Sequence, residues 1–454
     1  MNTNAKMKLN ILIAIMLVFS GICVAKTIKE SHPNGKRKLK YSVNKQGQKH
    51  GSYCKYFENG KLHIKCRYRK DILHGSYIER NKKNKIIWKA NYKNGKLHGI
   101  ATRFDKKGRM IWQGEYIHGD LRFPRSAKFL ATTLKQISKW SPSPEDKKLA
   151  KQQLVELIKN ENVPKLFRND ETFTKDKIMG LRRVMQYRFI CSVPYKHLRL
   201  HPQRNSHAQA AAYICKLINT IDHHPKNPGL PENVYDYCHI GTSQSNLTYG
   251  MGGVVTSLTS IDGYMDDSDP YNISKVGHRR WCLNPPMGYC GFGLTSKVMT
   301  SGKAKGMKAF FGAFYCFDLQ GETFEKYTKD YDWDFIKFPA QGYHPAKGFF
   351  GKNHAWSISV NPTKYQTPKT KDIKVMVYKS APAAIKKKQL KPVGEPLELG
   401  FFTVSNDSIG TGSCIIFRPE ALELKRNAAY IVVVEGLKDK DENPVELIYP
   451  VMFI

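Results

Sequence analysis

Residues 276–293 read VGHRRWCLNPPMGYCGFG, which places one histidine, two arginines and a tryptophan before a proline turn and a glycine-rich apolar run. The run CGFGLTSK predicts a strand over residues 290–297. Two roles are open to His278. It can line a site that carries out chemistry, or it can tie its loop to backbone carbonyls while Arg279 and Arg280 pair with nearby aspartates.

The segment before this stretch has a helical pattern. An alanine-rich run predicts a helix over residues 206–221, which cannot continue through Pro225. His223 follows the end of that run. Residues 254–267 keep an apolar stripe at helical spacing and predict another helix before His278. We therefore expect two histidine-bearing loops, each following a helix, to converge on one cleft.

Six motifs occur in a fixed order between residues 176 and 345: RFICSVPYKHLRLHPQRNSHAQAAAYI, DHHP, QSNL, IDGYMDD, GHRRWCLNP and CGFG. Together they resemble the CAP superfamily, the SCP-like extracellular domain of cysteine-rich secretory proteins, plant pathogenesis-related proteins and bacterial envelope proteins. The resemblance implies an α-β-α sandwich with a central antiparallel sheet over residues 176–350. It also implies an open cleft with two histidines and two acidic residues that can bind a divalent metal, often zinc.

By motif, the resemblance assigns His223 and His278 to the two cleft histidines, either as metal ligands or as catalytic acid and base. Asp267 and Asp269 are the available acidic ligands, although their spacing from His278 is not the usual one for the family. Catalytic zinc normally keeps three protein ligands and one open position. Two imidazoles with one uncertain carboxylate therefore predict a weak zinc site.

The family's Gly-Glu-Asn motif is changed in this sequence to Gln244-Ser245-Asn246. Ser245 therefore stands where a carboxylate is expected, either as a nucleophile beside the histidines or as a hydroxyl that fills the position. The resemblance places Ser245, Asn246 and Arg279 along the cleft.

A second pattern covers residues 26–125. His-Gly pairs begin at residues 50, 74, 98 and 118, and Asn-Gly pairs begin at residues 34, 59 and 94. Such a period, with alternating apolar runs between turn residues, predicts a β-hairpin repeat solenoid of about four units. The phrase YKNGKLHG resembles the MORN-type repeats of bacterial secreted and toxin-immunity proteins, which implies a rigid binding or spacing surface. The histidines of these pairs are either turn residues or a row of metal ligands.

The same segment carries much of the positive charge. It holds 27 Lys and Arg against 7 Asp and Glu, a net charge of +20 out of +36 for the whole chain. This excess predicts an anionic partner for the basic repeats. The candidates are an anionic envelope polymer, a lipid surface or a protein. Nucleic acid is not expected, because the N-terminus predicts export.

The N-terminal residues 1–25 have the pattern of a cleaved secretory signal peptide. Lys6 and Lys8 precede an apolar run over residues 9–24, and a lipoprotein with an acylated Cys23 is the alternative. The pattern predicts a secreted or envelope protein with no transmembrane helix after cleavage. Nine cysteines remain, and they read either as buried thiols or as local bridges, for which the pairs are Cys54 with Cys66 and Cys282 with Cys290.

Two further segments complete the predicted organisation, a multidomain α+β chain. Residues 126–175 predict a helical connector, in which Ser143 caps a helix that begins at Pro144. Residues 351–454 contain six short apolar or alternating runs and predict an immunoglobulin-like β-sandwich. No cluster in this last segment suggests a site.

Three functions follow from this organisation. The first is a binding protein whose basic repeats dock on an anionic surface while the cleft holds a small lipid, peptide or glycan. The second is a metal-dependent hydrolase, a peptidase or esterase that uses His223 and His278. The third is a structural or toxin-neutralising surface protein led by the repeats.

Overall fold

The structure is a computed structural model of the 454-residue chain. It describes residues 26–105, 110–117, 120–121, 127–168, 171–317, 333–386, 390–410 and 412–454. Over these residues the fold is mixed α/β, with one ten-stranded and three four-stranded sheets. The chain divides into two compact units, residues 1–121 and residues 122–454. The predicted signal segment lies outside the described residues.

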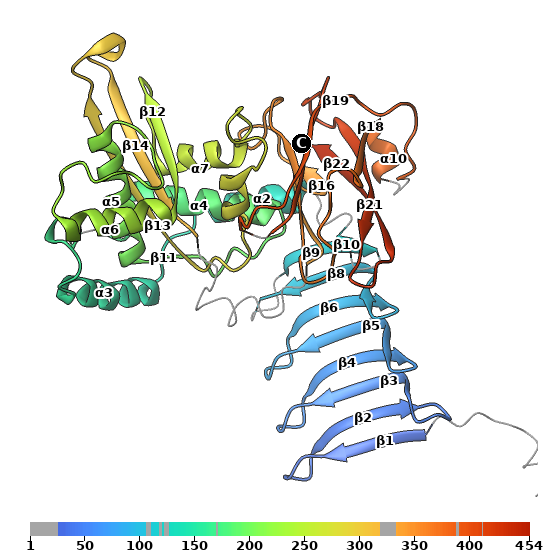
Figure 1. The fold of residues 1–454 in the computed structure, drawn as a ribbon. Helices are drawn as coiled ribbons and strands as arrows, with labels where there is room; N and C mark the ends of the chain where they lie inside the picture. Colours follow the sequence, from blue (N-terminus) through green and yellow to red (C-terminus); the bar gives the residue numbers. More distant parts are fainter. Residues whose placement is uncertain are drawn as a thin grey trace, which may run out of the picture. The chain divides into compact units, whose positions relative to one another are not determined.

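The first unit is one antiparallel sheet in which the long strands pair in chain order (Figure 1). Its strands are β1 (Lys26–Ser31), β2 (Arg37–Val43), β3 (Lys49–Tyr56), β4 (Leu62–Arg69), β5 (Ile72–Arg80), β6 (Ile86–Lys93), β7 (Lys96–Leu97), β8 (Gly99–Phe104), β9 (Met110–Ile117) and β10 (Asp120–Leu121). Asn-Gly turns join strands, as at Gly60, whose amide donates to the Phe57 carbonyl at 2.8 Å. One 24-residue period corresponds to two strands.

The His-Gly pairs lie in or at the start of strands, so the prediction that they form turns is wrong. Their glycines have φ of +97°, +94° and +89° and lie opposite a tyrosine of the next strand: Gly51 opposite Tyr68, Gly75 opposite Tyr92 and Gly99 opposite Tyr116. A glycine without a Cβ leaves room for a ring to lie close to the backbone. His118 and Gly119 lie outside the described residues.

The cysteine pairs of the sequence analysis do not form bridges. Cys54 lies opposite Lys65, whereas Cys66 lies opposite Tyr53, one position along the same pair of strands. Because successive side chains point to opposite faces of a sheet, these two thiols face apart. Cys282 and Cys290 are also free thiols, and both are buried.

The second unit begins with helices that cover a small sheet. The helices are α2 (Ala127–Ser138), α3 (Pro144–Lys159), α4 (Lys175–Ile190), α5 (Pro202–Ile218), α6 (Glu232–Ser243), α7 (Ser257–Asp266) and the short α8 (Gly277–Cys282). The strands are β11 (Arg199–Leu200), β12 (Ser245–Met251), β13 (Tyr289–Val298) and β14 (Lys308–Tyr315), in the spatial order β11-β13-β14-β12. Single 3-10 turns lie at Lys165–Phe167 and Gly302–Ala304.

The start of α3 is as predicted, with Ser143 accepting a hydrogen bond from the Asp146 amide and Pro144 in the first turn. The sequence pattern did not predict α6, which begins after Pro231 without a side-chain cap. It also placed His278 in a loop, whereas His278 lies in the short helix α8.

Helix α5 packs directly on β13 at two glycines. A Cβ on Gly291 would lie 2.1 Å from the Arg204 carbonyl carbon, and one on Gly293 would lie 2.2 Å from the Ala208 carbonyl carbon. Ala208 and Ala211 are fully buried on the helix. The small residues of CGFG and of the alanine-rich run therefore allow the close approach of this helix and this strand.

Gly293→Ala should lower the free energy of unfolding of the second unit by about 1–3 kcal/mol, because the helix backbone must move away from the new methyl group. Denaturation followed by tryptophan fluorescence measures the change. Gly253→Ala is the control, since a Cβ there meets nothing within 4 Å. Equal stability of both variants would contradict the proposed close contact.

The C-terminal part of the second unit contains two four-stranded sheets, and all six predicted runs are strands. One sheet has the order β15-β17-β20-β19, and the other has the order β16-β22-β21-β18. The strands are β15 (Phe335–Phe338), β16 (Gly342–His344), β17 (Trp356–Val360), β18 (Lys374–Ser380), β19 (Leu399–Ser405), β20 (Cys414–Pro419), β21 (Ala429–Lys438) and β22 (Pro444–Phe453), with a short helix α10 (Pro382–Lys386).

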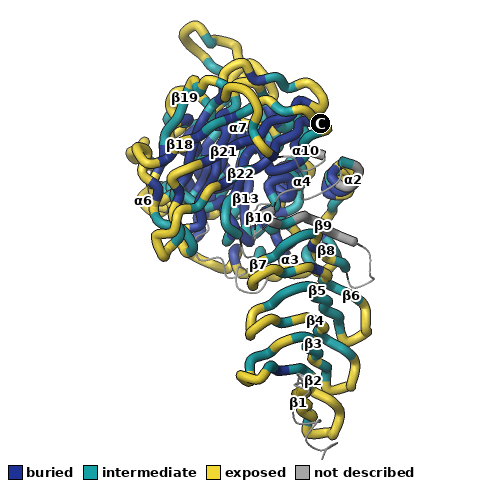
Figure 2. Tube along the Cα trace, turned by 90° about the vertical axis from the view of Figure 1, so that its right-hand side faces the viewer, coloured by how far each residue is buried: buried dark blue, intermediate teal, exposed yellow. Residues whose placement is uncertain are grey.

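The two sheets share one core, in which the Trp356 ring lies 6.0 Å from the Tyr430 ring. This core is continuous with buried residues of α4 such as Leu181 and Val184. Figure 2 shows the buried interior of the second unit and the mainly half-buried or exposed strands of the first. Among the described helices, none has both the length and the apolar character that a membrane span requires.

Candidate two-histidine site

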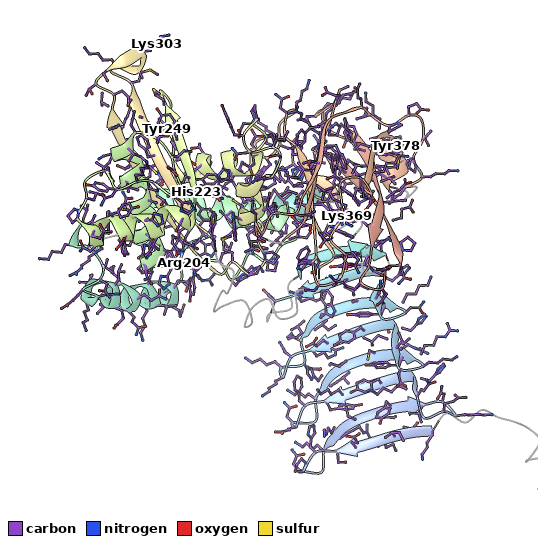
Figure 3. The ribbon with its side chains drawn as sticks, viewed as in Figure 1. Arg204, His223, Tyr249, Lys303, Lys369 and Tyr378 are labelled. Atoms are coloured by element: carbon purple, nitrogen blue, oxygen red, sulfur yellow. The ribbon has the colours of Figure 1, made fainter. Side chains whose placement is uncertain are left out.

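His223 lies in the loop between α5 and α6 (Figure 3). Two hydrogen bonds hold it to the end of α6. Its Nδ1–H donates to the Thr242 carbonyl at 3.0 Å, and the Thr242 hydroxyl donates to the His223 carbonyl at 3.0 Å. The contact with a carbonyl places the proton on Nδ1 and leaves the lone pair of the neutral ring on Nε2.

His278 is held in the same way by a carboxylate. Its Nδ1 donates to Asp267 Oδ1 at 2.9 Å, and the side chain of Asp267 is 1% exposed. Asp267 ends α7 in the left-handed conformation, with φ of 48°, which turns its carboxylate toward the start of α8. Within the described residues, the hydrogen bonds of both rings are made by Nδ1, and neither Nε2 atom has a hydrogen-bond partner.

The environments shift the pKa values of the two rings in opposite directions. Burial lowers the pKa of His278, but the hydrogen bond to Asp267 and the charges of Asp267 and Asp269 outweigh it and raise the pKa above 6.5. Burial lowers the pKa of His223, and the charge of His278 lowers it further. These effects outweigh the hydrogen bond to the Thr242 carbonyl, which raises the pKa. The positive charge of His278 therefore disfavours protonation of His223.

Buried residues of neighbouring elements form hydrogen bonds that fix the backbone of His278. Asn246 Nδ2 donates to the His278 carbonyl at 3.0 Å, and the Tyr264 hydroxyl donates to the Asn246 carbonyl at 3.0 Å. Ser245 and Asn246 are 0% exposed, and the Ser245 hydroxyl has no hydrogen-bond partner, histidine or other, among the residues that the structure describes. Ser245 is therefore not poised as a nucleophile in this structure.

An aromatic ring lies beside His223. The Phe317 ring is 6.2 Å from the His223 ring and stacks on Trp281 at 4.2 Å. Trp281 is 7% exposed. An imidazole next to an apolar ring is suited to a ligand with one polar end and one apolar body.

The described residues do not fit a zinc site with three protein ligands. They contain no group of three His, Cys, Asp or Glu side chains that is arranged to hold a metal ion. The Asp267 carboxylate already accepts hydrogen bonds from His278 and from the Arg279 amide. The Asp269 carboxylate accepts hydrogen bonds from the Tyr271 amide and the Asn272 side chain in its own turn. The site therefore offers two imidazole nitrogens.

In the structural role for His278 that the sequence leaves open, Arg279 and Arg280 pair with aspartate carboxylates. In the structure, both guanidinium groups bond mainly to carbonyl groups instead. Arg279 donates to the carbonyls of Met265 and Asp266, to the Ala355 carbonyl at 2.8 Å and to the Ser357 hydroxyl at 3.0 Å. Arg279 is 1% exposed, so it does not line an open cleft. It ties α8 to the C-terminal sheets.

Arg280 completes this attachment. It donates to the Ser405 hydroxyl at 2.9 Å, to the Asp407 carbonyl at 2.7 Å and to the Gly412 carbonyl. The helix turn that carries His278 is therefore fixed by two buried arginines on one side and by Asn246 on the other.

Arg188 was not singled out in the sequence. This fully buried residue of α4 donates to the Asn284 carbonyl at 2.6 Å and to the carbonyls of Cys282 and Pro285 at 3.2 Å each. It fixes the WCLNPP turn that follows His278. The position of Arg188 within the apolar helix pattern RVMQYRFI was the sequence signal that could have indicated a buried arginine.

No protein-family model matches the chain, and no curated protein matches it either.

Proposed function

We propose that the chain is a binding protein whose two-histidine site holds a small ligand with a carboxylate or similar anionic group and an apolar body. The observation that carries the proposal is the way each imidazole is held: Nδ1 of His223 bonds to the Thr242 carbonyl and Nδ1 of His278 bonds to the Asp267 carboxylate, which leaves Nε2 of each ring for a ligand. In this proposal residues 176–317 belong to a CAP-type module, as the sequence resemblance suggests. The two C-terminal sheets form an immunoglobulin-like module that begins at β15, earlier than the predicted boundary at residue 351.

The chemistry of the pair supports an anionic ligand. His278 keeps its proton to higher pH than an ordinary histidine, so its Nε2–H supplies a charged donor. His223 is the neutral partner, with an Nε2 lone pair that accepts from a hydroxyl or amide of the same ligand. The half-buried Phe317 ring, which lies 6.2 Å from the His223 ring, provides the surface for the apolar body.

The basic repeats provide a second, separate surface for docking. Direct cross-strand neighbours share one face of a sheet, and four exposed lysines lie in one such row across β1 to β6: Lys29, Lys40, Lys65 and Lys89. Alternate strands place the last three about 10 Å apart. In this proposal the row docks on a polyanion of the cell envelope, where the sequence predicts that the protein is located.

Isothermal titration with three carboxylate probes, octanoate, N-acetyl-leucyl-leucine and glucuronate, tests the small-ligand site. We expect at least one probe to bind, with affinity that falls as the pH rises through the pKa of His278. His278→Gln should weaken that binding about tenfold, which is the loss of one charge-assisted hydrogen bond. His224→Gln, at an exposed neighbouring histidine, is the matched control.

Failure of all three probes to bind, or equal binding by His278→Gln and His224→Gln, would contradict the proposed site. Binding that does not change with pH would argue against a charged His278 in the complex.

A second candidate function is acid–base hydrolysis of a peptide or ester. Two titratable groups whose pKa values are pushed apart are suited to the roles of general base and general acid, here His223 and His278 respectively. Ester and peptide substrates with fluorescent leaving groups test this function. Turnover that is lost in both His223→Gln and His278→Gln would establish it, and turnover unchanged in either would exclude it.

A further inference from the structure

We propose that the end of the β13–β14 hairpin, with the adjoining end of β12, docks on the surface of an anionic phospholipid bilayer. This membrane surface is distinct from the histidine site and from the basic sheet, and it does not depend on the proposed function of either. The hairpin projects from the second unit with Lys303 at its end (Figure 3), and Figure 2 shows this end as exposed.

The first observation is a group of exposed apolar side chains that the fold does not cover. Their exposed fractions range from 38% to 78%: Tyr249, Met251, Val254, Val298 and Met307. They come from three segments that meet at one end of the sheet. Val298 lies opposite Lys308, Met251 lies opposite Ala309, and the Gly252 amide donates to the Lys308 carbonyl at 3.1 Å.

Met307 belongs to the same surface. A Cβ on Gly252 would lie 2.8 Å from the Met307 methyl carbon, so the methionine side chain extends across the end of β12. Flexible apolar side chains of this kind insert readily between lipid head groups, and each gains free energy in proportion to the apolar area it buries.

The second observation is the charge around these side chains. Four lysines occupy the hairpin and its strands: Lys297, Lys303, Lys305 and Lys308. Residues 245–257 and 289–312 contain neither Asp nor Glu. Lys303, Lys305 and Lys308 are exposed. The end of the hairpin therefore presents only positive charge next to apolar groups.

This combination favours an anionic bilayer over other occupants. A protein partner with an apolar patch would leave the lysines unmatched, whereas a polyanion alone would leave the apolar side chains in water. Lysines near an anionic lipid surface contribute attraction within a Debye length, and apolar side chains between them bury beneath the head groups. A bilayer of anionic phospholipid satisfies both at once.

A fluorophore at the hairpin end separates this contact from binding by the basic sheet. Ser301→Cys labelled with an environment-sensitive dye should show a blue shift and rising intensity on titration with phosphatidylglycerol–phosphatidylcholine vesicles, and little change with phosphatidylcholine alone. Thr370→Cys, labelled in the same way, is the positional control. The unmutated chain measures background labelling, since the cysteines within the described residues are buried apart from the half-buried Cys54.

The charge test uses two matched lysine pairs in the full-length chain. Lys303→Glu with Lys305→Glu should weaken the dye response to anionic vesicles at least tenfold, because each lysine contributes to the attraction. Lys369→Glu with Lys371→Glu changes the net charge equally at an exposed pair elsewhere, and Figure 3 shows Lys369 far from the hairpin. This second variant should bind as the parent does.

The apolar test is Val254→Ser with Val298→Ser, which should weaken the response at constant charge, whereas Val393→Ser, at another exposed valine, should not. No spectral change at position 301 with anionic vesicles would overturn the proposal. Equal weakening by the two lysine pairs, or a response to phosphatidylcholine as strong as to the anionic vesicles, would also overturn it.

Discussion

Arg279→Ala should lower the free energy of unfolding of the second unit by about 3–5 kcal/mol. The guanidinium is 1% exposed, lies 4.5 Å from the centre of the Phe338 ring and donates to the carbonyls of Met265, Asp266 and Ala355. Removing it leaves these buried acceptors without donors and opens a cavity between α8 and the C-terminal sheets.

Denaturation followed by tryptophan fluorescence measures this loss in the transition of the second unit. Arg426→Ala removes an exposed arginine from the same unit and should change its stability by less than about 0.5 kcal/mol. If Arg279→Ala is as stable as this control, the arginine does not join α8 to the sheets.

Asp267→Asn should lower the pKa of His278 and weaken the binding of an anionic ligand about tenfold near neutral pH. The amide still accepts a hydrogen bond from Nδ1, so the ring stays in place, but the negative charge that favours the protonated ring is lost. Histidine NMR titration and isothermal titration measure the two effects. Asp269→Asn is the control, because Asp269 affects His278 only through its charge and should cause the smaller change in pKa.

The same pair gives the stability a defined pH dependence. The pKa of His278 is raised in the folded protein, so folding favours its protonated form. The stabilising contribution is complete below the ordinary histidine pKa of 6.5 and is lost as the pH rises through the raised pKa. Asp267→Asn should remove this contribution, and the stability difference from the parent protein should therefore be larger at pH 5.5 than at pH 9.

Local sequence signals predict much of the secondary structure. The Ser143 cap, the alanine-rich helix and the six C-terminal runs all correspond to elements of the structure, because their caps and periodicity act within a few residues. Helix α6 lacks a side-chain cap, and α8 has only six residues, so neither gives a strong signal. The position of the His-Gly pairs in strands depends on the tyrosines opposite, which local sequence does not specify.

The site was predictable only in part. His223 and His278 could be selected from the motifs, since each follows a helix and precedes a proline-containing turn. The hydrogen bond between Asp267 and His278 depends on the left-handed backbone at the end of α7. The hydrogen bond between His223 and Thr242 depends on α6, which the sequence did not predict. The burial of Ser245 and Asn246 depends on packing between distant elements, which spacing along the chain cannot reveal.

Histidine NMR titration of the unmodified protein tests the central claim most directly, which is that His223 and His278 form one site with opposed proton affinities. We expect His278 to titrate above and His223 below the ordinary histidine pKa of 6.5. We also expect His278→Gln to raise the pKa of His223, because a nearby positive charge is removed. Two rings that both titrate at 6.5, with no effect of one substitution on the other, would contradict the claim.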